Sequence, residues 1–428
     1  MSPVSRAARR TFRSLRVRNF RRYLIGQTVS VTGTWVQTVA SAWLVLKLTG
    51  SGVALGFVMA LSFLPILLLG PVGGLIADRF DKRRTLVMTQ ASFALLAGLL
   101  AVLVLGGVVQ VWQVYLISLA QGFVTAVDNP TRQSFVSEMV GNGDLTNAVS
   151  LNSAVMTGTR VVGPAVAATL IATMGIGWCF AINAVSYAAV IAGLLSMRRH
   201  DLVERPKAAR TRGAMLRGLR YAWRTRELRV PLLLMAVVFT LSFNFSVLFP
   251  MLAKGPFHGD AGTMGAVFSL MGLGSLVGAL LMAHRARPTA WLLPAACAAF
   301  GASTIAIGLS PDVQIAVPFL VLAGFTSIVF MITGNTTVQM RSADHMRGRV
   351  MAVYSMVFLG TTPIGAPIAG WVAQHGGPRL ALAAGGLVAI VVGAVASRSQ
   401  AILAPATAPA APIAIQSPPE PERQRSVA

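Results

Sequence analysis

The stretch GLIADRFDKRRTL at positions 74–86 places a small-residue helix end before Asp78, which is followed by four closely spaced positive charges. Apolar runs flank this stretch, from Val53 to Ala77 and from Thr85 to Leu105. Each run is long enough to cross a bilayer core about 30 Å thick, which takes roughly 20 mostly apolar residues. The stretch is therefore predicted to be a very short, basic loop between two membrane-spanning helices.

The composition is that of a membrane protein. Hydrophobic residues make up 55% of the chain and charged residues 11%, and the mean hydropathy is +0.68. Soluble domains carry about a quarter charged residues. The net charge of +23 does not indicate nucleic-acid binding, because the Lys and Arg residues sit between apolar runs and no water-facing basic domain is visible.

Twelve apolar segments reach membrane-spanning length. They are 23–46, 53–77, 85–105, 111–127, 148–173, 178–197, 230–252, 262–283, 291–309, 313–333, 350–373 and 380–397. With the N-terminus inside, 32 of the 36 Lys and Arg residues fall in cytoplasmic segments and three in outer loops. This bias follows the positive-inside rule and predicts that both termini are cytoplasmic.

The chain divides near its middle. We expect a basic N-terminal segment (1–22), a six-helix half (23–197), a basic linker (198–229), a second six-helix half (230–397) and a disordered Pro/Ala-rich tail (398–428). The end of the linker has apolar residues at helical spacing with arginines between them, which predicts a helix on an anionic leaflet. For the first part of the linker, a plain solvated connection is equally compatible with the sequence. The halves repeat weakly, since Gly122-Phe123 parallels Gly324-Phe325.

Further short motifs accompany the basic loop. They are RNFRRYLIGQTVS at 18–30 with Gly33 and Trp35, Leu48-Thr-Gly-Ser51, Leu64-Pro65, Asp128-Asn-Pro130, Leu145-Thr-Asn-Ala148 and Gly163-Pro164. Together they resemble the major facilitator superfamily, in the exporter branch that holds enterobactin exporters and macrolide or multidrug efflux proteins. The resemblance covers the first five spans closely and the second half only in topology. It implies an all-α membrane protein that exports a small organic molecule by alternating access, driven by protons.

The loop also predicts a gate. A glycine such as Gly74 lets its helix approach a neighbour closely, and Asp78 can accept hydrogen bonds from helix N-terminal amides or pair with Arg79 or Arg84. Such a latch would hold the cytoplasmic gate shut; a purely topogenic loop is the alternative. Asp81 stands where the family more often has Gly, and Asp tolerates a left-handed turn better than most residues. The predicted gating residues are Gly74, Asp78, Arg79, Arg83, Arg84, Gly163 and Pro164.

Arg160 is the one ionisable residue predicted to lie deep in a span. If its helix enters the membrane near Ala148, it lies about 18 Å along the helix, close to the midplane. A charge at that depth is costly and marks a functional site by default. Because no acid is predicted deep in any span, we expect Arg160 to face a water-filled cavity and bind an anionic group. A structural Arg that binds backbone carbonyls is the alternative.

Polar residues recur on single helix faces, which favours a polar cavity lining. In the resembled family the first and seventh spans line the cavity. Such faces occur on the first, fifth and seventh spans. The predicted substrate-binding residues on them are Arg160, Gln37, Asn244, Thr34 and Thr157. Ordinary hydrogen bonding between helices is the alternative reading, above all for single Ser and Thr residues.

Asp128, placed at the inner end of the fourth span, is the candidate proton-coupling residue, because no acid is predicted deeper. The alternatives are coupling through a charged substrate and coupling to something other than protons. The five His and two Cys are scattered, so the chain is predicted to hold no catalytic site, metal or cofactor. The predicted function is secondary active export of a small, anionic or amphipathic organic molecule by a monomer in the inner (plasma) membrane. The alternative is a non-transporting receptor or scaffold with the same fold.

Overall fold

The computed structural model describes residues 13–141, 143–202, 214–283 and 291–399, and the regular elements in these ranges are all helical. The predicted tail and parts of the basic N-terminal segment and linker lie outside the described residues. The elements are η1 (Arg13–Arg16), α2 (Arg18–Thr49), α3 (Gly52–Arg79), α4 (Lys82–Leu105), α5 (Val111–Met139), α6 (Leu145–Thr173), α7 (Ile176–Leu195), η2 (Arg199–Asp201), α8 (Ala214–Arg224), α9 (Arg226–Leu241), α10 (Phe245–Lys254), α11 (Ala261–Ala283), α12 (Leu292–Leu309), α13 (Val313–Arg341), α14 (Arg347–Gly360) and α15 (Thr362–Ser397).

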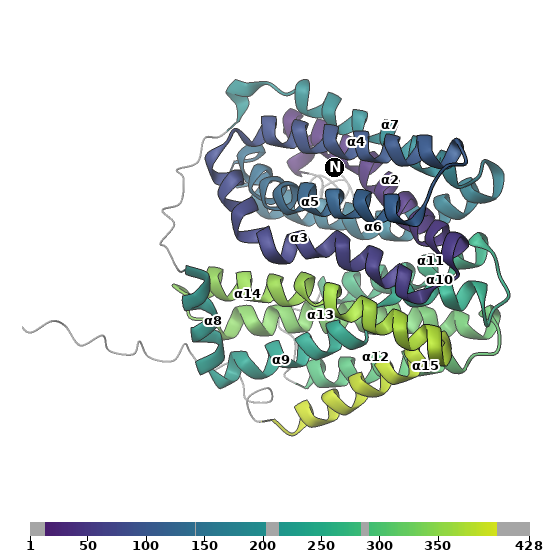
Figure 1. Cartoon of the computed structure of the whole chain (residues 1–428). Helices are drawn as coiled ribbons and strands as arrows, with labels where there is room; N and C mark the ends of the chain where they lie inside the picture. Colours follow the sequence, from purple (N-terminus) through teal and green to yellow (C-terminus); the bar gives the residue numbers. More distant parts are fainter. Residues whose placement is uncertain (1–12, 142, 203–213, 284–290, 400–428) are drawn as a thin grey trace, which may run out of the picture.

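These helices provide twelve membrane spans within the described ranges. Ten segments are long and apolar enough to cross a bilayer. Helix α5 is slightly less apolar than these ten. The tenth segment, Arg347–Ser397, has 51 residues and is long enough for two spans. That segment is broken at Gly377, whose φ of 84° is left-handed. Adding α5 and dividing the last segment gives the twelve predicted spans, with six in each half (Figure 1).

Short polar caps explain the tight connections. The Ser51 hydroxyl accepts a hydrogen bond from the Ala54 amide at 3.2 Å and so starts α3 after the left-handed Gly50. Asp81 was expected to suit a left-handed turn, and that expectation is wrong. Its φ is −60° and its carboxylate accepts the Arg84 amide at 2.7 Å, so Asp81 is the N-cap of α4.

The fourth span is longer than predicted. The sequence suggested an end at Val127, before a proline, whereas α5 continues to Met139. Pro130 cannot donate a hydrogen bond to the carbonyl four residues earlier, that of Ala126. This carbonyl lies directly against Gly73 of α3, where no Cβ intervenes. The close approach of α3 keeps the helix intact through its proline and places Asp128 well inside it.

The seventh span is also different from the prediction. It was expected to be one helix, but it is broken between Leu241 and Phe245 into α9 and α10. The hydroxyl of Ser242 donates to the Gly385 carbonyl at 2.6 Å, and the amide of Asn244 donates to the Thr240 carbonyl at 2.7 Å. The Asn244 side chain thus satisfies a backbone acceptor at the break, as non-helical backbone inside a membrane requires, and the Ser242 side chain ties the break to α15.

The two halves meet along two helix pairs with almost no side chain between them. On α3, Gly52 and Gly56 lie against the backbone of Gly370 and Ala366 on α15. On α11, small residues face α6, and the Ser269 hydroxyl donates to the Val161 carbonyl at 3.0 Å. Small residues allow such backbone contact between membrane helices.

One end of the bundle is closed between the halves. We call the end with the loops at 80–81, 140–144 and 342–346 the basic end and the other the far end. At the far end, Gln374 accepts hydrogen bonds from the Ser51 hydroxyl at 2.6 Å and the Val53 amide at 3.2 Å. The Lys254 ammonium donates to the Leu46 carbonyl at 3.3 Å. These bonds and the glycine contacts seal the far end.

Towards the basic end the halves separate. Gly70 lies on the same face of α3 as Gly52 and Gly56, five turns further on, yet a Cβ there would meet nothing within 4 Å. Similarly, Ser153 shares the α11-facing side of α6 with Pro164 but is exposed. In the described part of the chain, the structure is therefore open between the halves at its basic end.

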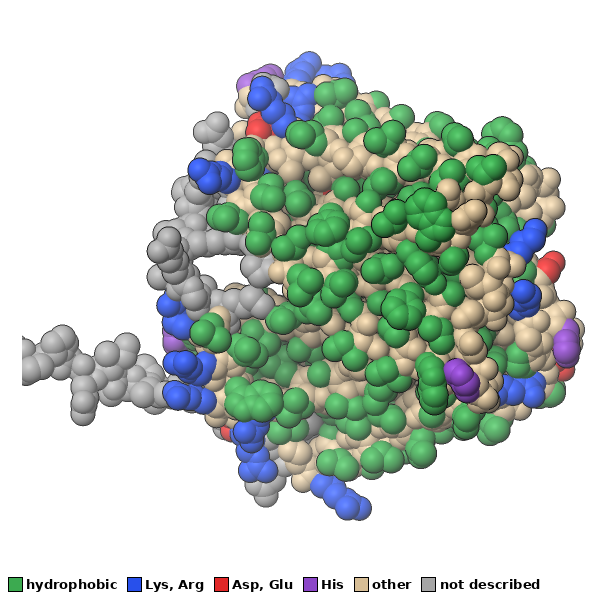
Figure 2. All heavy atoms as spheres, in the orientation of Figure 1, with side chains coloured by type: hydrophobic (Ala, Val, Ile, Leu, Met, Phe, Trp, Pro, Cys, Tyr) green, Lys and Arg blue, Asp and Glu red, His purple; other side chains and the backbone are tan. Residues whose placement is uncertain are grey.

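The outer surface matches a membrane environment. Figure 2 shows apolar side chains across the middle of the molecule, with Lys and Arg gathered at its two ends. Aliphatic side chains such as Leu95, Val185 and Leu309 are more than 70% exposed. Exposed tryptophans lie near helix ends, as in the aromatic belts of membrane proteins. They are Trp112, Trp178, Trp223, Trp291 and Trp371.

Candidate substrate site between the two halves

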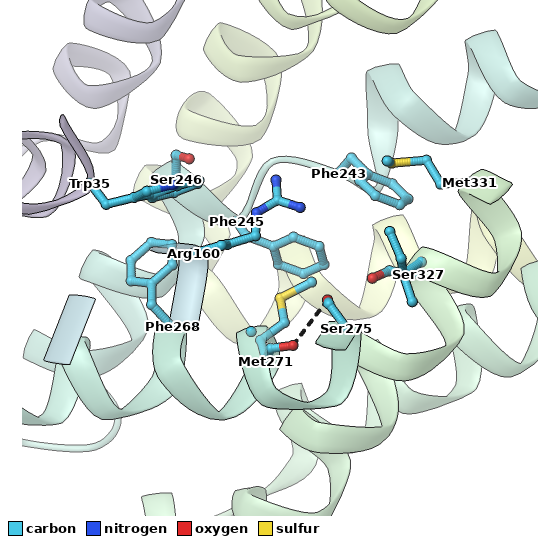
Figure 3. A pocket seen from close by; sticks show the side chains of 12 residues that line it. Trp35, Arg160, Phe243, Phe245, Ser246, Phe268, Met271, Ser275, Ser327 and Met331 are labelled. Atoms are coloured by element: carbon cyan, nitrogen blue, oxygen red, sulfur yellow. Dashed lines mark hydrogen bonds between the residues drawn. The ribbon is translucent and has the colours of Figure 1, made fainter. Parts of the chain in front are cut away.

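A pocket of about 110 Å³ lies between the halves, roughly midway along the spans. This volume holds several water molecules, since one water needs about 10–15 Å³ measured in this way. Two residues of the first half and ten of the second form its wall (Figure 3). The lining residues are Trp35, Arg160, Phe243, Phe245, Ser246, Phe268, Met271, Gly272, Ser275, Ser327, Ile328 and Met331.

Arg160 is the charged residue of this pocket. Its guanidinium carbon lies 5.3 Å from the centroid of the Trp35 ring, which covers one face of the cation. The side chain is deep in the bundle yet exposed to the pocket, and no carboxylate of the described residues pairs with it. Figure 3 shows the guanidinium pointing towards the break between α9 and α10. Its in-plane N–H groups are therefore available to a ligand.

The position of Trp35 follows from the Gly-Pro pair in α6. A Cβ at Gly163 would overlap the Cβ of Trp35, so α2 and α6 pack there in close contact. Pro164 cannot donate to the carbonyl of Arg160, and the freed carbonyl faces Gly272 of α11. Helix α6 nevertheless runs on without a break. Gly163 thus places the ring over the cation, and Pro164 belongs to the seam between the halves.

The break in the seventh span adds a second positive element. Helix α10 begins at Phe245 in the pocket wall, with Ser246 in its first turn. The first amides of a helix lack intrahelical partners and carry the positive end of its dipole. Discontinuous helices in transporters commonly direct such ends at anionic substrate groups. The N-terminal end of α10 and the guanidinium of Arg160 therefore both favour a negatively charged ligand group.

Aromatic rings form the apolar part of the wall. Phe243, in the break, lies 4.7 Å from Phe300 and 5.1 Å from Phe239 between ring centroids. Phe245 and Phe268 both lie near Phe249, at 4.8 Å and 5.2 Å. Rings at these spacings make a large apolar surface with little flexibility. The pocket therefore combines one cation with a rigid aromatic wall.

The other predicted substrate-binding residues are not in the pocket lining. Gln37 is buried and accepts a hydrogen bond from the Asn183 amide at 2.6 Å. The Thr34 hydroxyl donates to the Ser30 carbonyl and lies 3.4 Å from the Tyr187 hydroxyl. Thr157 donates to the Ser153 carbonyl, and Asn244 is buried beside the break. Only Arg160 of the five lines the pocket, and a substrate role for the other four stays a prediction.

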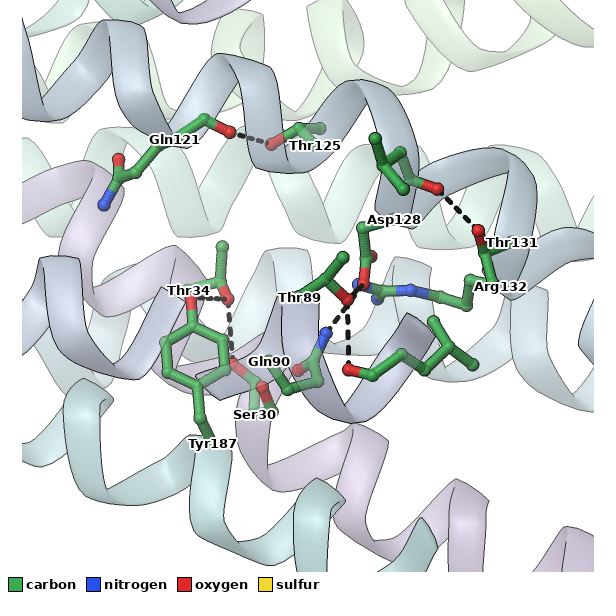
Figure 4. Close-up of polar contacts among 12 residues, drawn as sticks. Ser30, Thr34, Thr89, Gln90, Gln121, Thr125, Asp128, Thr131, Arg132 and Tyr187 are labelled. Atoms are coloured by element: carbon green, nitrogen blue, oxygen red, sulfur yellow. Dashed lines mark hydrogen bonds and ion pairs between the residues drawn. The ribbon is translucent and has the colours of Figure 1, made fainter. Parts of the chain in front are cut away.

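A buried polar centre lies in the first half (Figure 4). Asp128 is 1% exposed and forms an ion pair with Arg132, one helical turn further along α5. It also accepts hydrogen bonds from the Thr89 hydroxyl at 2.7 Å and the Gln90 amide at 2.9 Å. Asp128 was expected at the inner end of the fourth span; it lies inside α5, which continues to Met139, and its role in coupling stays a prediction. Tyr23, close to this pair, has a buried hydroxyl without a hydrogen-bond partner among the described residues.

The residues of the basic loop are held to different elements. Arg83 donates to the Leu194 and Leu195 carbonyls at 2.6 and 2.7 Å, and so caps the end of α7. Gly74 is buried, and Arg79 and Arg84 are exposed. The backbone of Asp78 is in the last turn of α3, but its side chain lies outside the described part of the structure. The latch therefore stays a prediction.

Sequence reasoning missed most of the lining residues of the second half. Phe268, Met271 and Met331 are apolar residues in apolar helices, and nothing in the sequence distinguishes them from lipid-facing ones. Trp35 was singled out only as part of a motif. The signal that could have found it is Gly163, since a glycine in one span implies a close neighbour in another.

The fold and the site define a membrane transporter: in the described residues, two six-helix halves enclose a pocket and separate from each other towards one end of the bundle. The family model described as transmembrane secretion effector matches residues 9–425. The chain therefore belongs to this family of major facilitator transporters, and it is not an enzyme. The resemblance inferred from the motifs is confirmed.

Known relatives include exporters of siderophores and drugs. The chain is 25% identical to the staphyloferrin A transporter of Staphylococcus aureus, over 78% of this chain and 84% of that protein. It is 26% identical to the multidrug efflux pump Tap of Mycobacterium tuberculosis, over 89% and 93%. It is 24% identical to the enterobactin exporter EntS of Citrobacter koseri, over 87% and 90%.

Solved structures show the same fold. A bacterial homolog of the human lysosomal transporter Spinster superposes with a TM-score of 0.71 at 15% identity, over 90% of this chain and 98% of that chain.

Proposed function

We propose that this chain is a secondary active exporter of small amphipathic organic molecules that carry an acidic group next to an aromatic or apolar body. The observation that carries the proposal is the guanidinium of Arg160, which is deep in the bundle, open to the pocket and without a described carboxylate partner. A cation in a low-dielectric cavity attracts anionic groups strongly. The aromatic wall receives the apolar body of the same molecule.

Export is supported by the relatives, three of which are named as a staphyloferrin A transporter, a multidrug efflux pump and an enterobactin exporter. The positive-inside rule assigns the basic end and both termini to the cytoplasm. With this assignment the opening between the halves faces the compartment from which an exporter loads. A monomer in the inner membrane suffices, because both halves of the pocket come from one chain.

Proton coupling is assigned to Asp128. Of the described acids it lies furthest from a helix end and is 1% exposed, so a change in its protonation acts on the packing of α4 against α5. Protonation would remove the charge that holds Arg132 and would weaken the two hydrogen bonds that the carboxylate now accepts. Influx of protons down their gradient can then drive the outward movement of cargo.

The experiment measures export of three matched dyes: an aromatic carboxylate, its neutral amide and a quaternary ammonium analogue. Wild type is expected to export the carboxylate, and collapse of the proton gradient should stop it. Arg160→Ala should reduce carboxylate export by roughly tenfold or more, as expected for loss of a charged hydrogen bond. Arg160→Lys should be intermediate, because an ammonium lacks the planar fork.

The control variant is Arg21→Ala, which removes an exposed positive charge outside the pocket. A cytoplasm-active reporter fused after Ala428 tests the orientation in the same cells. Normal carboxylate export by Arg160→Ala, or export of the quaternary ammonium dye alone, would show that Arg160 is structural. An inactive reporter would place the C-terminus outside the cytoplasm and overturn the assigned direction.

A further inference from the structure

Helix α8, at the end of the linker, lies across the bundle rather than along it. Figure 1 shows α8 running across the ends of the spanning helices at the basic end. The change of direction occurs at one extended residue, Thr225, with φ −92° and ψ 107°, after which α9 enters the bundle. A helix at the end of the bundle and across its axis lies parallel to the membrane surface.

The circumference of α8 divides into three sectors of different chemistry. Gly218 and Ala222 face the protein and are buried. The adjacent sector is apolar and exposed, with Leu216 at 62%, Leu219 at 44% and Trp223 at 56%. The third sector carries exposed arginines at helical spacing, namely Arg217, Arg220 and Arg224. An apolar sector bordered by a basic one is the pattern of helices that lie in a membrane interface.

We propose that α8 is a binding site for anionic phospholipids of the leaflet at the basic end, and that it transmits the state of this leaflet to α14, the helix that follows the loop at 342–346. Leu216, Leu219 and Trp223 enter the boundary between headgroups and acyl chains. The three arginines then lie at phosphate level, where their charge is complementary to an anionic leaflet. This inference does not depend on the cargo or the direction of transport.

Helix α8 contacts α14, and this contact connects the lipid site to the opening between the halves. A Cβ at Gly218 would lie 2.9 Å from both the Cβ and the carbonyl oxygen of Arg349, so the two helices touch at their backbones. Ala222 belongs to the same buried cluster as Met346 and Val350. The backbone amide of Ala343, before α14, lies 3.5 Å from the Tyr221 hydroxyl. A leaflet that holds α8 therefore also holds the start of α14.

The other end of α14 lies about 20 Å further into the bundle, at the inner edge of the opening between the halves. Gly360 contacts Leu67 of α3, one turn before Gly70, beside which the space is open. Movement of α14 towards α3 would narrow this opening. Because α8 fixes the start of α14 in the open arrangement, anionic lipid is expected to favour the open basic end.

Binding is tested on the purified full-length protein in vesicles of phosphatidylcholine with and without phosphatidylglycerol. The variant Arg217→Gln/Arg220→Gln/Arg224→Gln should lower the apparent affinity for phosphatidylglycerol, measured as co-purified lipid, on the order of tenfold or more. The matched control Arg16→Gln/Arg18→Gln/Arg21→Gln removes the same charge from exposed positions on the first half. Equal loss in both variants would show a general charge effect and overturn the site.

Transmission to the gate is read as a distance between spin labels on Cys residues introduced at Ser150 of α6 and Ser355 of α14, both exposed. The native Cys179 and Cys297 are 0% exposed and will not compete for label. Phosphatidylglycerol should shift the distance distribution of wild type towards the open arrangement, and the α8 variant should lose this shift. An unchanged distribution in wild type, or a full shift in the α8 variant, would overturn the proposal.

Discussion

Two arginines on the helices of the first half differ in how their charges are compensated. Arg132 is paired with Asp128, and two further groups bind that carboxylate from α4. Arg160 has an aromatic ring over one face and an open pocket before it, and none of the described acids pairs with it. The first charge is satisfied inside the protein, and the second is left to be satisfied from outside.

This difference separates two roles for charge in a membrane. A buried ion pair loses several kcal/mol when one partner is removed, because the other charge stays behind without compensation. A cation that already lacks a partner loses nothing of that kind when it is neutralised. Neutralising Asp128 should therefore lower stability in addition to affecting coupling, whereas neutralising Arg160 should affect function alone.

The largest effect is expected for Asp128→Asn, which leaves Arg132 without its counter-charge. The variant should lose about 3 kcal/mol of stability and unfold at a lower temperature in detergent. Arg160→Gln should unfold at or above the wild-type temperature. The double variant Asp128→Asn/Arg132→Gln should recover part of the loss. Equal unfolding temperatures for Asp128→Asn and wild type would contradict the comparison.

A smaller effect is expected for Gly163→Ala. Its Cβ would displace Trp35 and loosen the cover of the Arg160 guanidinium, an interaction worth about 0.5–2 kcal/mol. Affinity for the carboxylate dye should fall severalfold in an equilibrium binding measurement, with little change for the neutral amide. If both dyes lose affinity equally, the substitution acts through general packing and not through the cation.

The smallest effect is expected at the basic loop. Asp78→Asn should slow turnover a few-fold and leave folding and dye binding intact, because a latch acts on exchange between states. Asp81→Asn is the matched control, since Asn caps a helix about as well as Asp. Turnover is measured as the initial rate of dye export. Equal rates for Asp78→Asn and wild type would mean that the acid only supports topology.

The sequence predicted the span count and the family because both depend on features that a membrane imposes on every residue. Apolar length and the position of Arg and Lys do not require knowledge of neighbours. The end of the fourth span was mispredicted for the opposite reason. Whether a helix survives Pro130 depends on Gly73 of another helix, which no local pattern contains.

The candidate site was predictable only at a residue whose burial in the membrane costs free energy. Arg160 was found because a lone charge in a span needs an explanation. The polar face with Thr34 and Gln37 was read as cavity lining, but these residues face Tyr187 and Asn183 of α7. A helical period shows that residues share a face and not what the face meets. The break at Phe243 was invisible because both flanking segments are equally apolar.

The stripe of Gly52, Gly56 and Gly70 along α3 has a mechanical consequence. At the far end Gly52 and Gly56 lie against the backbone of α15, so few side chains stand between the two helices when the halves move. Such a contact guides the relative motion of the two halves, and its free energy differs little between the two end states. The preference between the two end states is then set elsewhere, by the charges and ligands at the ends of the bundle. A transporter whose halves meet in this way can change between its two states under small forces.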